Sequence, residues 1–162
     1  MLVPEDGAVP QEIGPGGLEN PQEQMEKLRS LKILVAEDNK INQSVALHML
    51  KSIGCHADMA QDGVEAVEMA ISRSYDMIFM DCEMPRMNGL EATAAIFRVK
   101  READAPVIIA LTAHAFASQQ RQCLAAGMKA CLTKPIKKNE LLDVLMRFTG
   151  TIHPVEGVVS GG

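Results

Sequence analysis

The chain has 162 residues, of which 47% are apolar, and a formal net charge of −5. This length is typical of one domain with short tails, and the acidic balance argues against a nucleic-acid-binding face. The four cysteines are scattered, which argues against a zinc site. No signal peptide is visible, and no apolar run is long enough to span a membrane. We therefore expect a cytoplasmic chain with reduced thiols.

Residues 1–30 are predicted to form a flexible tail or linker. They contain four of the eight prolines and four of the twelve glycines, a composition typical of disorder. Near the end of this segment, Met25, Leu28 and Leu31 recur at a spacing compatible with a short helical lead-in over 22–31. Residues 151–162 are predicted to form a second flexible tail, which leaves 31–150 as the domain.

Short apolar runs alternate with amphipathic segments within 31–150. Runs of this length suit strands that are buried on both faces of a parallel sheet. They lie at 33–36, 57–60, 77–80, 107–111 and 130–132. Five βα units with right-handed crossovers predict an α/β fold with a doubly wound, five-stranded parallel sheet.

Helix signals fall in the intervals between these runs. Asp62 and Asn88 are each followed three residues later by a glutamate, which is the capping-box spacing. Gly127 and Gly150 stand where a helix end favours a positive φ. The first interval is predicted to bury one apolar face, formed by Ile41, Val45, Met49 and Ile53.

Polar residues follow four of the predicted strands at their carboxyl ends, where open α/β sheets bind ligands. They are Glu37, Asp38, Asp81, Thr112, Thr133 and Lys134. Alone, Asp38 could be a helix cap and Asp81 a turn residue. Together, three carboxylates facing one lysine are poorly balanced, because two carboxylates about 4 Å apart repel by ~4 kcal/mol at an effective dielectric of about 20. Oxygen ligands with this charge deficit indicate Mg²⁺.

Four motifs in this order carry a family resemblance: Glu37-Asp38, Asp81-Cys-Glu-Met-Pro-Arg-Met-Asn-Gly89, Leu111-Thr-Ala113 and Lys134-Pro-Ile136. Over essentially all of 31–150 the chain resembles the receiver domain of two-component response regulators. The stretches at 36–43 and 123–128 look most like receivers of hybrid histidine kinases. The resemblance implies a flavodoxin-like, CheY-like (βα)5 fold with strand order 2-1-3-4-5.

The resemblance also implies a role for each matched residue. Asp81 is the expected phosphoacceptor. The expected ligands of Mg²⁺ (or Mn²⁺) are Asp38, Asp81, the backbone carbonyl of Glu83 and, through a water molecule, Glu37. The phosphoryl group is expected to contact Thr112, Ala113 and Lys134, and the peptide bond before Pro135 is expected to be cis.

The implied partners are a histidine kinase or a histidine phosphotransfer protein, and a downstream effector protein. We expect a monomer or a weak dimer that binds no nucleic acid. Phosphoryl transfer to Asp81 would act as a signalling switch or relay, so the chain by itself is not a turnover enzyme. If the chain is a receiver segment excised from a hybrid sensor, its parent would be a histidine kinase.

Two features depart from the family pattern or are expected to tune it. Cys131 occupies the position where the family usually carries the Tyr or Phe that couples to the hydroxyl switch. Glu83 and His114 each lie two residues after a central site residue, and we hypothesise that they set the lifetime of the phosphoryl group. His114 as a metal ligand or phosphodonor is disfavoured relative to an ordinary loop histidine, and His48 is interpreted as structural or surface-exposed.

The sequence disfavours three alternatives. A haloacid-dehalogenase-like aspartyl-phosphate hydrolase would use a similar set of Asp, hydroxyl, Lys and Mg²⁺. It would also require a second Asp, as general acid, at the position of Glu83. A flavin-binding domain would need a phosphate loop after the first strand, where Glu37 and Asp38 would repel the phosphate. A receiver that only binds proteins usually lacks one of the four motifs, and none is missing here.

Overall fold

The computed structural model describes residues 21–101 and 104–148. Their strands form one parallel sheet in the order β2-β1-β3-β4-β5, which confirms the predicted doubly wound fold and the implied strand order. The strands are β1 (Ile33–Ala36), β2 (Ala57–Ala60), β3 (Met77–Asp81), β4 (Val107–Thr112) and β5 (Ala130–Thr133). The last three extend one residue beyond the predicted runs, because Asp81, Thr112 and Thr133 still belong to the sheet.

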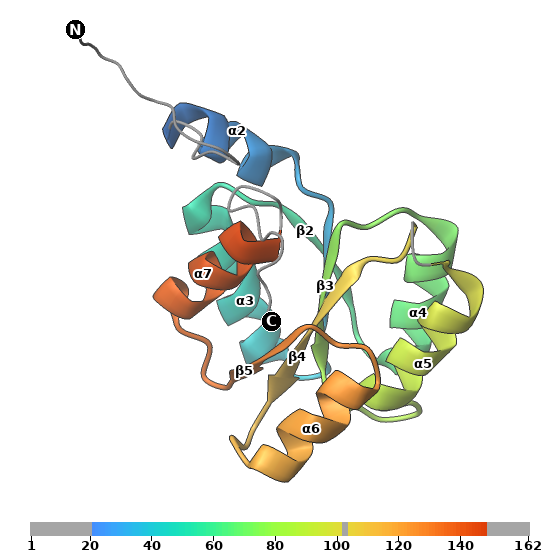
Figure 1. Ribbon diagram of the computed structural model, residues 1–162. Coiled ribbons are helices and arrows are strands. Elements are labelled where there is room, and N and C mark those ends of the chain that lie inside the picture. The colour runs from blue at the N-terminus through green and yellow to red at the C-terminus, as the bar shows by residue number, and fades with distance from the viewer. Residues whose placement is uncertain (1–20, 102–103, 149–162) are drawn as a thin grey trace, which may run out of the picture.

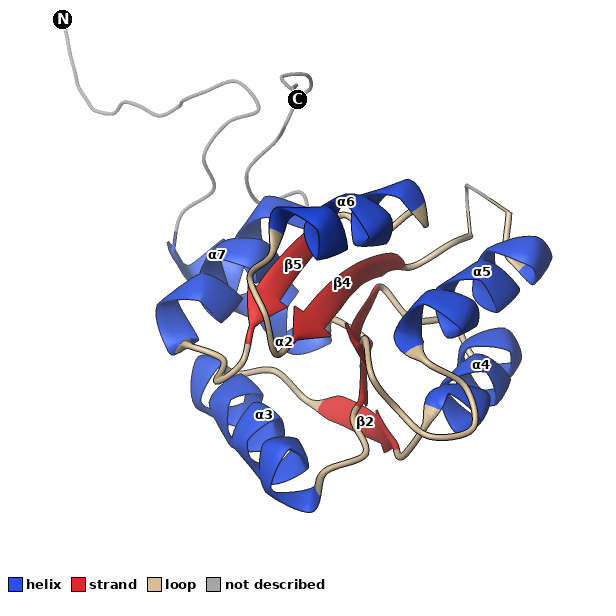
Figure 2. Cartoon of the chain, turned by 90° about the horizontal axis from the view of Figure 1, so that it is seen from below, coloured by secondary structure: helices blue, strands red, loops and turns tan. Residues whose placement is uncertain are grey.

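Helices cover both faces of this sheet (Figure 1). They are α2 (Pro21–Ser30), α3 (Lys40–Ile53), α4 (Gly63–Ser72), α5 (Gly89–Val99), α6 (Ala117–Ala125) and α7 (Lys138–Phe148). Helices α3 and α7 lie on one face, and α4 and α5 lie on the other, as Figure 2 shows from below. The result is a three-layer sandwich that leaves the carboxyl ends of the strands uncovered by helices.

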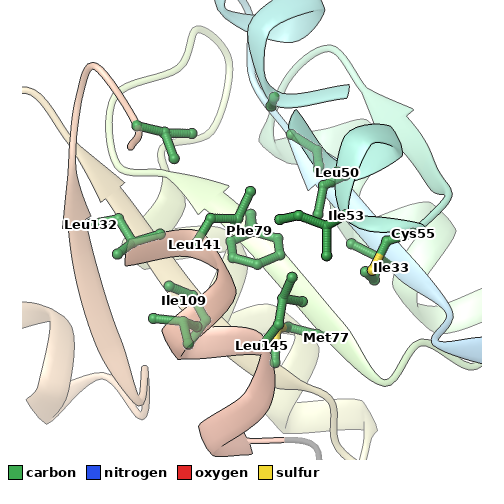
Figure 3. Close-up of a cluster of buried hydrophobic side chains, with 14 of the residues drawn as sticks. Ile33, Leu50, Ile53, Cys55, Met77, Phe79, Ile109, Leu132, Leu141 and Leu145 are labelled. Carbon is green, nitrogen blue, oxygen red and sulfur yellow. The ribbon is translucent and has the colours of Figure 1, made fainter. Parts of the chain in front are cut away.

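The sheet separates two hydrophobic cores, because successive side chains of a strand point to opposite faces. In β3, Met77 and Phe79 enter the core beneath α3 and α7, whereas Ile78 and Met80 enter the core beneath α4, α5 and α6. Figure 3 shows Phe79 between the buried side chains of α3 and α7. Strands β1, β3 and β4 are therefore buried on both faces, as predicted.

The outer strands do not follow that prediction. Strand β2 exposes Asp58 and only partly buries Ala57 and Met59, and β5 fully buries only Leu132. Both strands lie at sheet edges, where one neighbouring strand is missing and helix cover is incomplete. Their short apolar runs could not distinguish an edge strand from a central one.

The predicted helix ends are mostly confirmed. At α5, Asn88 and Glu91 form a reciprocal capping box. At α4, Asp62 accepts from the Glu65 N–H, but the Glu65 side chain accepts from the Gln61 N–H, so this end is not a strict capping box. Gly127 adopts φ 106° after α6, as predicted, whereas Gly150 and the tail at 151–162 lie outside the described residues.

The predicted apolar face of α3 was only partly correct. Ile53 is buried and Met49 packs partly buried against the core, but Ile41 and Val45 are exposed. The buried residues of this helix are Gln43, Ala46, Leu50 and Ile53. The prediction followed steps of four residues, each of which overshoots one helical turn by about 40°. A face that stays buried alternates steps of three and four, and here it includes a glutamine that a hydrophobic pattern cannot reveal.

The end of the predicted N-terminal tail is helical. Residues 21–30 form α2, in agreement with the lead-in over 22–31, and Leu28 is 3% exposed within the core beneath α3 and α7. All four cysteines are free thiols, and Cys131 alone is only partly buried. Within residues 21–101 and 104–148, no helix is long and apolar enough to cross a membrane.

Helix α7 is expected to depend on Leu145, which is fully buried beside Phe79 (Figure 3). Leu145→Ala should lower the free energy of unfolding by about 2–5 kcal/mol, since it opens a cavity without altering a polar group. The matched change Leu124→Ala, at a position 53% exposed on α6, should alter it by no more than about 0.5 kcal/mol. Urea unfolding measures both, and equal effects of the two substitutions would contradict this assignment of the core.

Candidate functional site

Three carboxylates meet at the carboxyl edge of the sheet. Glu37 and Asp38 follow β1, and Asp81 ends the neighbouring strand β3. One oxygen from each side chain lies within 4.8 Å of the other two. The sheet therefore brings together acids that are more than 40 residues apart in the sequence.

The three acids differ in their exposure. Glu37 and Asp81 are 1% and 2% exposed, whereas Asp38 is open to solvent. Asp38 does not cap the helix that follows it, because that position belongs to Asn39, whose side chain accepts from the Asn42 N–H. The capping alternative for Asp38 is therefore excluded, and its carboxylate stands at the open side of a buried acidic pair.

Lys134 supplies the positive charge. Its Nζ lies 3.1 Å from Oδ2 of Asp81 and 3.4 Å from Oε2 of Glu37. The backbone N–H of Lys134 donates to the Thr112 carbonyl at 2.7 Å, which ties the end of β5 to the end of β4. The peptide bond between Lys134 and Pro135 is cis, as the resemblance implies.

Hydrogen bonds from nearby residues hold the two buried acids. The Asn39 N–H donates to Oε1 of Glu37 at 3.1 Å, and the Glu83 N–H donates to Oδ1 of Asp81 at 3.1 Å. The side-chain amide of Gln43 donates to the Glu37 carbonyl at 2.7 Å. Gln43 thus explains why α3 buries a polar residue: its amide fixes the backbone that carries Glu37.

The charges at this edge are not balanced within the described residues. Burial raises the pKa of Asp81 from 3.8 to about 7; the Glu83 N–H and Lys134 lower it, and the Glu37 side chain raises it. Burial lowers the pKa of Lys134, but Asp81 and Glu37 outweigh this effect and raise it above its usual range. One lysine cannot neutralise three acids, which leaves a site suited to a divalent cation with oxygen ligands.

The loop after Asp81 is tightly fixed. A Cβ on Gly89 would lie only 2.3 Å from the Asp81 carbonyl oxygen, so no side chain fits there. Arg86 has a positive φ of 66° and pairs with Asp62 at the start of α4, with Nη2–Oδ2 at 2.7 Å. The loop that carries Glu83 is thereby held at both ends, beside Asp81 and against α4.

Thr112 lies beside Asp81 across the β3–β4 pairing, one position beyond Leu111, which is the register partner of Asp81. Its side chain is buried, whereas Ala113 and His114 are exposed. The Thr112 hydroxyl lies 2.9 Å from the His114 carbonyl and 2.8 Å from Oε1 of Gln119, and it accepts from the His114 N–H at 3.1 Å. The hydroxyl is thus bonded to the segment that leads into α6.

Three thiols lie behind this edge. The Sγ atoms of Cys82 and Cys123 are 3.5 Å apart, and both residues are buried. Burial, followed by the neighbouring Cys123, raises the pKa of both Cys82 and Cys131 far above the usual range. Protonated, buried thiols are poor nucleophiles, so we assign this cluster a packing role beneath α6.

Sequence reasoning missed three contributors to the site: Gln43, Arg86 and Gln119. Each acts through a contact with a residue distant in the sequence or lying on another element. Arg86 stands within the motif that begins at Asp81, and Gln43 within the stretch at 36–43, but neither motif indicated these contacts, and Gln119 belongs to none of the motifs.

Comparison with known proteins identifies the class to which this fold and site belong. Residues 33–146 match the response regulator receiver domain family. The chain is 41% identical over 126 residues to hybrid signal transduction histidine kinase B of Dictyostelium discoideum, covering 72% of this chain and 6% of that protein. It is 35% identical over 124 residues to the sensor protein GacS of Pseudomonas syringae, covering 75% of this chain and 14% of that protein.

Solved structures agree. The receiver domain of a sensor histidine kinase from Pseudomonas aeruginosa, with magnesium coordinated in its active-site cleft, has a TM-score of 0.68 and 42% identity, covering 74% of this chain and 98% of that one. The receiver domain of a Saccharomyces cerevisiae response regulator, crystallised with a histidine phosphotransfer protein, has a TM-score of 0.71 and 26% identity. This match covers 78% of this chain and 94% of that one.

The chain therefore belongs to the response regulator receiver domain family of two-component phosphorelays. It spans only a small part of the hybrid kinases that it matches. The family match over 33–146 excludes the haloacid-dehalogenase-like hydrolase that stood as the nearest enzyme alternative.

The excess negative charge of the three carboxylates should lower the stability of the metal-free protein. In the presence of a chelator, Asp81→Asn should raise the free energy of unfolding at neutral pH by about 1–3 kcal/mol, because it removes a buried charge that one lysine must share. Lys134 keeps Glu37 as its partner in this variant.

Asp143→Asn is the control, since Asp143 forms an exposed ion pair with Arg147 and should contribute no more than about 0.5 kcal/mol. Urea unfolding of the three proteins provides the measurement. A loss of stability in Asp81→Asn would show that the acidic cluster is already balanced without a metal ion.

Proposed function

We propose that this chain accepts a phosphoryl group on Asp81 from the phosphohistidine of a histidine kinase or a histidine phosphotransfer protein. The observation that carries the proposal is the Asp81 carboxylate at the end of β3, 3.1 Å from Lys134 and within a cluster of three acids. In the transfer, an Asp81 oxygen forms the new bond to phosphorus while the bond between phosphorus and the donor imidazole breaks. An ionised carboxylate needs no general base for this attack.

The residues present fit a magnesium site. Asp38, Asp81 and the backbone carbonyl of Glu83 would hold the ion, with Glu37 acting through a water molecule. Mg²⁺, or Mn²⁺ in its place, would supply the positive charge that keeps the carboxylates ionised and offsets the phosphoryl oxygens. The cluster geometry supports this assignment, since oxygens of three acids lie within 4.8 Å of one another.

The protein groups mainly position and neutralise, which is what a loose phosphoryl-transfer transition state requires. Lys134 reaches both buried acids and can shift its ammonium group to an incoming phosphoryl oxygen. Thr112 ends the adjacent strand with its hydroxyl available for exchange of partners, and the Ala113 backbone follows it. The chain therefore acts as a switch or relay that returns to its starting state after dephosphorylation, and not as a turnover enzyme.

The relatives indicate the kind of signalling protein in which this receiver works. The chain covers 6% of the first two hybrid kinases that it matches, and we infer that it serves as the receiver segment of such a sensor or as a separate receiver working with one. In the first case the parent protein would be a histidine kinase with this segment on the cytoplasmic side. The related yeast receiver that crystallised with a phosphotransfer protein supports a partner of that class, and a downstream effector remains part of the proposal.

The central prediction concerns Asp81. Incubation with Mg²⁺ and acetyl phosphate should add one phosphoryl group that is stable in acid and labile in base, as seen by intact-mass analysis. Asp81→Asn or a chelator should abolish the adduct. The control is Asp143→Asn, which changes an exposed aspartate on α7 and should leave the adduct intact.

Absence of any adduct on the wild-type chain would instead favour a receiver that acts only by binding proteins. An adduct that persists in Asp81→Asn would place the phosphoacceptor elsewhere.

A second prediction concerns the lifetime of the phosphoryl group. Glu83 and His114 are both exposed at the rim of the site, where their side chains can order or obstruct the attacking water. Glu83→Ala and His114→Ala should each change the dephosphorylation rate by about 2–10-fold, the effect of altering one hydrogen bond.

Arg121→Ala, at an exposed position on α6, serves as the control. The decay of purified phosphoprotein gives the rates. Rates equal to those of the wild type in both variants would remove Glu83 and His114 from this role.

A further inference from the structure

The Thr112 hydroxyl is bonded to the α6 side of the site. Each hydrogen bond found for it leads to His114 or Gln119: the His114 carbonyl at 2.9 Å, the His114 N–H at 3.1 Å and Oε1 of Gln119 at 2.8 Å. A hydroxyl has one proton and two lone pairs. The His114 carbonyl and Oε1 of Gln119 therefore share the single proton of Thr112, and the His114 N–H occupies one of its lone pairs.

Gln119 belongs to the first turn of α6, while Thr112 ends β4. Figure 2 shows the loop that runs from β4 into this helix. The contact therefore joins the strand end beside Asp81 directly to a helix on the surface. A phosphoryl group that takes the Thr112 hydroxyl would have to break this contact.

Helix α6 is otherwise weakly attached. Phe116 at its N-cap provides no side-chain hydrogen bond, and Cys123 is the one buried residue within Ala117–Ala125. Phe116 and Leu124 are 64% and 53% exposed. Because this helix buries so little, the part-buried hydrogen bond from Thr112 to Gln119 is a distinct tie between its first turn and the sheet.

The aromatic side chain that the receiver resemblance implies at position 131, coupled to the Thr112 hydroxyl, is absent from this chain. Position 131 carries a cysteine, which is partly buried beside Cys123, and no aromatic ring is available there to follow the hydroxyl. Among residues 21–101 and 104–148, Gln119 is the side chain that connects Thr112 to a surface helix.

We propose that Gln119 is a positioning residue that latches Thr112 to α6 in the unphosphorylated chain and releases the first turn of α6 when the hydroxyl turns to the phosphoryl group. This inference rests on the proposed phosphorylation of Asp81. Phosphorylation and the position of α6 are then coupled, so that loosening the latch favours phosphorylation and phosphorylation loosens the latch.

The test replaces Gln119 by side chains of similar length. Gln119→Met removes the polar atoms and should speed phosphorylation by limiting acetyl phosphate about 2–10-fold, the effect of one hydrogen bond. Gln119→Glu keeps an acceptor for the Thr112 hydroxyl and should retain the wild-type rate. Gln120→Met, at the adjacent and similarly half-buried position, should also leave the rate unchanged.

A double-mutant cycle separates the latch from a general effect on α6. In a Thr112→Val background, Gln119→Met should no longer change the rate, since the hydroxyl that it restrains is gone. Urea unfolding of every variant checks that the fold is kept. Equal phosphorylation rates for the wild type and Gln119→Met, or acceleration by Gln119→Glu as well, would contradict the proposed role of Gln119.

The hydrogen bond can also be followed without phosphorylation. The side-chain amide resonances of Gln119 should shift in Thr112→Val but not in Ser118→Ala, and unchanged Gln119 resonances would overturn the proposal. If these shifts occur while the wild-type chain takes up no phosphoryl group, the proposed function fails and the contact between Thr112 and Gln119 stands by itself.

Discussion

The ion pairs of Lys134 with Glu37 and Asp81 are the interaction on which the rest of the site depends. Two acids at 1% and 2% exposure need a counter-charge to remain ionised in a folded chain, since buried unpaired charges are costly. Lys134 reaches both from the far side of β4 because β3, β4 and β5 end in register. The doubly wound sheet therefore makes the site possible, and the site in turn accounts for polar residues at the ends of apolar strands.

The surroundings of Asp81 are rigid on one side and adaptable on the other. Gly89 closes against its carbonyl, and the Arg86–Asp62 pair holds the following loop. Toward α6, by contrast, Thr112 is bonded to a helix that buries little apolar surface. A receiver needs both properties, because the phosphoryl group requires fixed ligands whereas a signal requires a segment that can change its contacts.

The net charge of −5 is misleading as a guide to this chemistry. Residues 31–150 contain equal numbers of acidic and basic residues, 14 of each, so the domain is formally neutral. The functional imbalance is local, at three acids that share Lys134. Burial converts that arrangement into a raised pKa for Asp81, an effect that composition cannot express.

By itself, the sequence determined the elements, the acids at the strand ends and the family, because strand-length apolar runs, capping residues and the four motifs are local signals. It could not determine strand order without the resemblance, nor which strands lie at the edges, since both depend on pairing between distant segments. Half of the buried face of α3 was misassigned because a strict four-residue spacing drifts around the helix, and because the face includes Gln43, whose amide donates to the Glu37 carbonyl. Only the tertiary structure showed Gln119 on Thr112, because that contact depends on how α6 returns to the sheet.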